Sequence, residues 1–126
     1  MTRSIALEYG GKGVTCNVIT PSAITRLAEG RDTTGFPPMD PALVAAGVAW
    51  LCHEACTMSG ENLISLAGRL AKAFIAETPG VYQQAWTIED VAAQMEAIGR
   101  VETPLAFPTL PTGFYDHLKY SFEMAR

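Results

Sequence analysis

The side chains best suited to binding a metal ion or acting as nucleophiles gather at Cys52, His53 and Cys56. On a helix, Cys52 and Cys56 share one face, at positions i and i+4, while His53 points about 100° away from them. Only Cys16 could add a further thiolate, and a structural zinc site takes four ligands. We therefore predict no metal site. Buried, unreactive thiols are favoured over the alternative of metal ligands.

A second candidate for chemistry is His117, which follows Tyr115 and Asp116. A histidine beside a carboxylate could exchange protons near neutral pH. Neighbours along a helix, however, do not face one another. A surface helix is the favoured interpretation, and the sequence assigns no catalytic residue.

A binding site is predicted where the run from Val14 to Ile19 ends in Thr20-Pro21-Ser22. The run is apolar on both faces, as expected for a strand covered by helices. A proline disfavours continuation of regular structure, so the chain is expected to turn there. In α/β proteins the carboxyl end of a parallel strand opens onto the ligand crevice.

The flanking segments predict a βαβ unit. A helix over Arg3–Tyr9 is stopped by the glycines of residues 10–13, and a long loop covers residues 22–40. Asp40-Pro41 then begins a helix that reaches about Ala55, with Asp40 as its N-cap. An apolar strand over Asn62–Ala67 follows and is closed by Gly68. Strand, helix and strand in this order require two parallel strands.

Beyond Gly68 the pattern is mainly helical. Lys72–Ala76 could form a further short strand. A capping-box pattern at residues 87–90 precedes an apolar stripe that ends at Gly99, whereas residues 103–113 carry three prolines and read as a linker. Phe114, Leu118 and Phe122 indicate a last amphipathic helix. We divide the chain into residues 1–75, an α/β unit, and residues 76–126, a helical extension.

Composition excludes several classes of function. The 126 residues carry a net charge of −4, and the nine basic residues are scattered, so no nucleic-acid or anionic-lipid surface is expected. No apolar stretch is long enough to cross a bilayer, and no secretory leader is recognisable. Three cysteines in no framework spacing predict free thiols and a cytoplasmic location.

The motifs also resemble a known family. Asn17-x-Ile19-x-Pro21 and the later string Gly60-x-x-Ile64-x-x-Ala67-Gly68 are similar to the last two core strands of the short-chain dehydrogenase/reductases. Pro21-Ser-Ala-Ile-Thr-Arg-Leu27 and Trp50-Leu-Cys-His-Glu-Ala-Cys56 resemble the branch of that family that acts on (3R)-hydroxyacyl-CoA. The resemblance implies a partial Rossmann-like fold, in which two parallel strands and a crossover helix precede a helical extension.

For function, the resemblance implies an NAD(P)-dependent oxidoreductase for a hydroxyacyl-CoA or a similar secondary alcohol or ketone. It places the nicotinamide end of NAD or NADP against Pro21, Ser22, Ala23, Ile24 and Thr25, and a substrate lid over residues 26–40. The lid residues from Arg26 to Asp32 could contact a CoA phosphate, and a solvated loop is an equal alternative. Ser22 stands where most members have glycine, and Arg26 where most have threonine.

Two family motifs are missing from the sequence. The Gly-rich turn that holds the cofactor pyrophosphate is absent, because Gly10-Gly11-x-Gly13 follows a helix and precedes a strand. The catalytic Ser and Tyr-x-x-x-Lys are absent too. The sequence thus resembles the carboxyl-terminal portion of such an enzyme and predicts no turnover by this chain alone. The alternative is a non-catalytic dimerisation or regulatory module, as a homo-oligomer or paired with a full-length relative.

Overall fold

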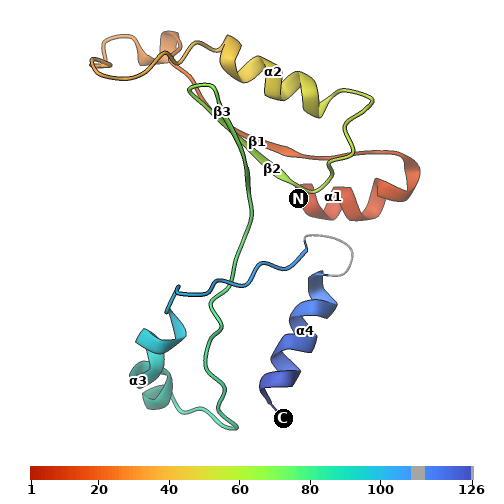
Figure 1. Ribbon diagram of the computed structural model, residues 1–126, viewed down its shortest axis with the longest axis vertical. Coiled ribbons are helices and arrows are strands. Elements are labelled where there is room, and N and C mark those ends of the chain that lie inside the picture. Colours follow the sequence, from red (N-terminus) through yellow and green to blue (C-terminus); the bar gives the residue numbers. More distant parts are fainter. Residues whose placement is uncertain (109–112, 126) are drawn as a thin grey trace. The chain divides into compact units, whose positions relative to one another are not determined.

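The computed structural model describes residues 1–108 and 113–125 of the chain. It divides into two compact units, Met1–Ala73 and Phe74–Arg126, each of which is described below by itself. The first unit holds the sheet and two of the α-helices, and the second holds the other two (Figure 1).

The first unit is built on a three-stranded sheet with the order β1-β2-β3. Its strands are β1 (Val18–Ser22), β2 (Asn62–Leu66) and β3 (Arg69–Ala73). β1 and β2 are parallel, with Val18 opposite Asn62 and Ser22 opposite Leu66. The predicted α/β class and the parallel pair are confirmed.

The predicted bounds of β1 were wrong at both ends. The strand begins at Val18 rather than Val14, and it continues through Pro21 and Ser22, where a turn was expected. Pro21 is tolerated because β1 lies at one edge of the sheet and proline removes only a backbone donor. Its missing N–H lies on the side away from β2, since the Val18 N–H donates to the Glu61 carbonyl at 2.8 Å and alternate residues face the same way.

β3 forms a hairpin with β2, so the sheet is mixed rather than two parallel strands alone. The two strands are antiparallel and are joined by Ala67 and Gly68, with φ angles of 48° and 79°. A two-residue turn with both φ angles positive matches the right-handed twist of paired strands. The strand considered over Lys72–Ala76 therefore lies earlier, at Arg69–Ala73.

α2 (Ala42–Leu51) connects β1 to β2 and packs on one face of the sheet, as Figure 1 shows. Gly47, at its centre, is buried, and a Cβ placed there would lie 3.2 Å from Leu70 Cδ2 and 3.5 Å from Leu63 Cδ2. The Asp40 carboxylate accepts a hydrogen bond from the Ala42 N–H at 2.7 Å, although the residue directly before the helix is Pro41 and not, as predicted, Asp40. The helix ends at Leu51, short of the predicted Ala55.

The amino-terminal helix α1 (Thr2–Tyr9) runs into a 3-10 turn, η1 (Gly10–Lys12). Gly13 then adopts φ 75°, a left-handed conformation that glycine reaches without strain. The predicted glycine stop is confirmed at Gly13, because Gly10 keeps a right-handed helical backbone.

The second unit contains α3 (Ile88–Ile98) and α4 (Gly113–Met124), both at the predicted places. Thr87 and Asp90 form the predicted capping box. Glu77 and Leu105 exchange backbone hydrogen bonds at 2.8 Å, which joins the two extended segments of this unit. Residues 109–112 of the predicted linker lie outside the described residues.

Among the described residues the buried apolar core is small. Only Ala6 and Cys56 fall in this class of buried hydrophobic residues, and Ser65 is the one buried polar residue. Many large apolar side chains are exposed instead, including Leu66 at 44% and Ile88 at 85%. No described helix is both long and apolar enough to span a membrane.

Candidate functional site

The five predicted cofactor-binding residues lie in one continuous stretch at the carboxyl end of β1. Pro21 and Ser22 are the last residues of the strand, opposite Ser65 and Leu66 of β2. Ala23 and Ile24 follow, and Thr25 precedes the 3-10 turn η2 (Arg26–Ala28). The chain remains extended through Pro21 instead of turning there, so it leaves the sheet only after Ser22.

The polar groups of this stretch differ in what they can still bind. The Ile24 N–H is used inside the protein, since it donates to the Met39 carbonyl at 2.8 Å. The Thr25 hydroxyl oxygen accepts a hydrogen bond from the Leu27 N–H at 3.3 Å, which leaves its own proton available. The half-buried Ser22 side chain offers a second hydroxyl. Both hydroxyls can donate and accept hydrogen bonds.

The loop after the stretch forms a shallow depression of about 490 Å³ lined by Thr25, Arg26 and Leu27. Leu27 is 90% exposed, so the depression has no closed wall. Farther along, Asp32 accepts a hydrogen bond from the Thr34 N–H at 2.9 Å. Hydrogen bonds from the Thr34 hydroxyl and N–H lower the pKa of Asp32, which keeps a negative charge on the predicted lid.

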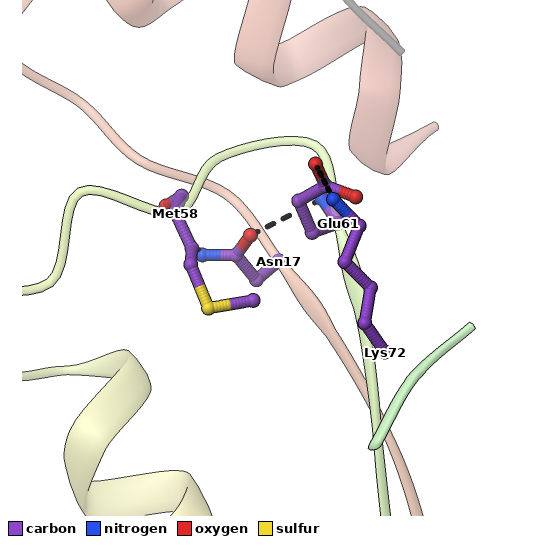
Figure 2. A network of polar contacts seen from close by, with 4 residues as sticks. All are labelled: Asn17, Met58, Glu61 and Lys72. Carbon is purple, nitrogen blue, oxygen red and sulfur yellow. Dashed lines mark hydrogen bonds and ion pairs between the residues drawn. The ribbon is translucent and has the colours of Figure 1, made fainter. Parts of the chain in front are cut away.

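Asn17 positions the strand that carries the site (Figure 2). Its side-chain N–H donates to the Met58 carbonyl at 2.8 Å, and its side-chain oxygen accepts from the Glu61 N–H at 3.2 Å. Glu61 also binds Lys72 of β3 at 2.7 Å. Asn17 thus ties the start of β1 to the segment that leads into β2. In the sequence, Asn17 stood inside the predicted strand and in the family motif Asn17-x-Ile19-x-Pro21, but nothing there indicated these two bonds.

The cysteine and histidine side chains near residue 53 have structural contacts. The His53 Nδ1 accepts a hydrogen bond from the Ala55 N–H at 3.1 Å, and its ring stacks on Trp50 with centroids 5.9 Å apart. Cys56 is buried, whereas Cys52 is exposed, so the prediction of buried thiols was wrong for Cys52. The helix ends before Cys52, so the two thiols do not share a helix face. Within the described ranges, no group of three or more metal-binding side chains occurs.

His117 pairs with a residue that the sequence did not indicate. Its Nε2 lies 3.4 Å from Glu77 Oε2, and its ring stacks on Phe107 with centroids 5.5 Å apart. The Tyr120 hydroxyl, one turn along α4, donates to the Pro79 carbonyl at 3.5 Å. These contacts hold α4 against the segment over residues 77–79, and they involve neither Tyr115 nor Asp116.

No family model matches this chain, but comparison with known proteins finds similar sequences. Peroxisomal multifunctional enzyme type 2 of Drosophila melanogaster is 36% identical over 81 residues, which are 64% of this chain and 14% of that enzyme. Peroxisomal multifunctional enzyme A of Dictyostelium discoideum is 29% identical over 114 residues, which are 86% of this chain and 25% of that enzyme.

This chain resembles one part of a peroxisomal multifunctional enzyme. The solved structure of the full-length type 2 enzyme from Drosophila melanogaster matches 98% of this chain with a TM-score of 0.73 and 23% identity, and the match covers 23% of that structure. At that identity the structural match shows the shared fold. The resemblance predicted from the strand and helix motifs is confirmed. The chain spans a quarter or less of the length of each of these relatives.

Proposed function

We propose that this chain is the carboxyl-terminal portion of an NAD(P)-dependent short-chain oxidoreductase acting on a hydroxyacyl-CoA or a similar secondary alcohol or ketone. The observation that supports this most is the continuous stretch Pro21–Thr25 at the carboxyl end of a strand in a parallel pair. Ligands of α/β sheets bind at that end of the strands. The similarity to peroxisomal multifunctional enzymes points to the same class of reaction.

In this proposal the stretch holds only the nicotinamide end of the cofactor. The hydroxyls of Ser22 and Thr25 would bind the carboxamide, and Pro21 would offer its apolar ring edge. When bound, the nicotinamide accepts or gives the hydride. The residues do not fit the pyrophosphate, because the glycines of residues 10–13 form a 3-10 turn between a helix and a strand. No residue of this chain is assigned proton transfer.

The experiment is a pair of assays on the purified full chain. Oxidation of NADH or NADPH by a 3-ketoacyl-CoA is expected to stay at the rate of the protein-free blank. Cofactor binding, followed by nicotinamide fluorescence, is expected to be far weaker than in a complete dehydrogenase. Turnover by the chain alone would contradict the proposal, because it would require a proton-transfer group that we have not found.

A second candidate function is a non-catalytic dimerisation or regulatory module. It is favoured by the apolar side chains that α2 leaves exposed, Leu43 at 39% and Trp50 at 47%. The outer edge of β2 is already paired with β3, so a homo-oligomer would use α2 rather than that strand. Light scattering tests this by measuring the oligomeric state of the wild type and of Trp50→Ser, with Trp86→Ser as the control. A monomeric wild type that binds no full-length relative would refute it.

The compartment is also a proposal. Cys16, Cys52 and Cys56 are free thiols, and two of them are not buried. We infer a reducing compartment such as the cytoplasm, although the relatives are named peroxisomal enzymes. Fractionation of cells that produce the chain, with a peroxisomal and a cytoplasmic marker, distinguishes the two.

A further inference from the structure

Among the described residues, two side chains of α4 bond to other segments of the same unit. The His117 Nε2 lies 3.4 Å from Glu77 Oε2, and the Tyr120 hydroxyl donates to the Pro79 carbonyl at 3.5 Å. The His117 ring also stacks on Phe107, with centroids 5.5 Å apart and planes inclined by 18°. Of these attachments, only the contact between His117 and Glu77 changes its charge with pH near neutrality.

The two groups that contact the His117 ring are held together without α4. Glu77 and Leu105 exchange backbone hydrogen bonds at 2.8 Å, which joins the segment that carries the carboxylate to the segment that carries Phe107. A carboxylate attracts a protonated imidazole, and the face of an aromatic ring attracts a cation within about 6 Å. Both neighbours of His117 therefore favour its protonated form.

The other charged groups on the elements around His117 leave this preference in place. On α4 they are Asp116, Lys119 and Glu123. Asp116 is negative like Glu77, and Lys119 lies 4.0 Å from Glu123, one turn away on the same helix. Residues 105–107 carry no charge. α3 meets the segment of Glu77 through a neutral contact, in which the Thr78 hydroxyl donates to the Ile98 carbonyl.

We propose that His117 and Glu77 form a pH-sensitive clamp on α4. Histidine side chains take up a proton between about pH 8 and pH 5, a range in which carboxylates stay ionised. The attraction is therefore present at the acid end of this range and is lost as the pH rises. Because 47% of the His117 side chain and 44% of the Glu77 side chain are exposed, solvent screens the pair, and α4 should open about threefold more often at pH 8 than at pH 5.5.

The other histidine of the chain, His53, responds to acid in the opposite way. It belongs to the first unit, and its Nδ1 accepts a hydrogen bond from the Ala55 N–H at 3.1 Å. A ring nitrogen accepts a hydrogen bond only while it is unprotonated, so acid breaks this bond instead of strengthening it. Since the chain has two histidines, His53 serves as the control for His117.

The test is amide hydrogen exchange of the full chain at about pH 5.5 and about pH 8, with each rate divided by the intrinsic rate of the same amide at that pH. In the wild type, the amides of α4 should be about threefold better protected at the lower pH. His117→Phe keeps an aromatic ring against Phe107 but cannot be protonated, so α4 should be equally protected at both pH values. His53→Phe should retain the wild-type difference.

A second variant keeps the proposal falsifiable if His117→Phe fails to fold. Glu77→Gln retains the backbone hydrogen bonds with Leu105 and removes the carboxylate, so most of the pH difference in α4 should disappear. Salt at about 1 M should reduce the wild-type difference as well, because it screens a charge pair. Equal protection of α4 at both pH values in the wild type would overturn the proposal, and so would a threefold difference that persists in Glu77→Gln.

Discussion

Asn17→Ala should destabilise the first unit more than any other single hydrogen-bonding change near the sheet. The substitution removes the donor to the Met58 carbonyl and the acceptor for the Glu61 N–H together. Both bonds are partly buried and join segments more than forty residues apart in the chain. The Lys72–Glu61 ion pair stays in place but is partly exposed, so it compensates little.

The magnitude follows from the two backbone groups left without a partner. Each lost hydrogen bond costs about 1 kcal/mol, and an unsatisfied buried group costs up to about 3 kcal/mol. Because Met58 and Glu61 are only half-buried, water reaches them in part, and the expected loss is about 2 kcal/mol. For a unit the size of Met1–Ala73 this lowers the melting temperature by roughly 8–16 °C.

The assay is urea unfolding of the full chain followed by circular dichroism, with amide exchange at Glu61 as the local readout. Thr20→Val is the matched control, because it removes the exposed Thr20–Asn62 hydrogen bond of 2.9 Å from the same strand and should change stability by less than about 0.5 kcal/mol. The reasoning is refuted if the two variants are equally stable, or if the Glu61 amide exchanges no faster in Asn17→Ala.

Four further predictions concern packing, turns and caps. Gly47→Val should lower the free energy of unfolding by about 1–3 kcal/mol, because the larger side chain would press against the sheet. Gly47→Ala should be nearly neutral, because the higher helix propensity of alanine offsets the tight contact. Urea unfolding midpoints compare the two variants. Ala67→Gly should raise the melting temperature, since a left-handed φ of 48° costs alanine about 1 kcal/mol; an unchanged or lower value would contradict this. Thr87→Ala should cost about 1 kcal/mol and speed amide exchange in the first turn of α3 alone. Hydrogen bonds from the Thr87 hydroxyl and N–H lower the pKa of Asp90 below its usual 3.8. The cap is therefore complete above pH 3.8 and is lost as the pH falls through the lowered pKa. NMR titration of the Asp90 carboxyl group should show a higher midpoint in Thr87→Ala than in the wild type.

Exposed apolar surface is the main physical feature of the isolated chain. Side chains at 40% exposure or more occur on β2, α3 and α4, among them Leu66, Met95 and Phe122. Within each unit, apolar side chains exposed in this way are available for contact with another polypeptide. The proposed dimerisation through α2 would cover two further side chains that are exposed in the same way, Leu43 and Trp50.

Local sequence determined the elements whose signals lie within a few residues. The capping box at Thr87 and Asp90, the stop at Gly13 and the Asp40 cap each satisfy backbone groups of their own element, so neighbouring residues suffice to predict them. The alternation of strand and helix likewise required a parallel pair, because a helix-length crossover returns the chain in the same direction.

Tertiary structure alone decided the features that depend on distant segments. The start of β1 at Val18 follows from Asn17 bonding to residues 58 and 61, which nothing in residues 14–19 specifies. The strand continues through Pro21 because that residue lies on an open edge, where a missing N–H costs no ladder bond. Strand limits and edges are set by which partner a backbone group meets across the sheet, and that information is absent from any short stretch of the chain.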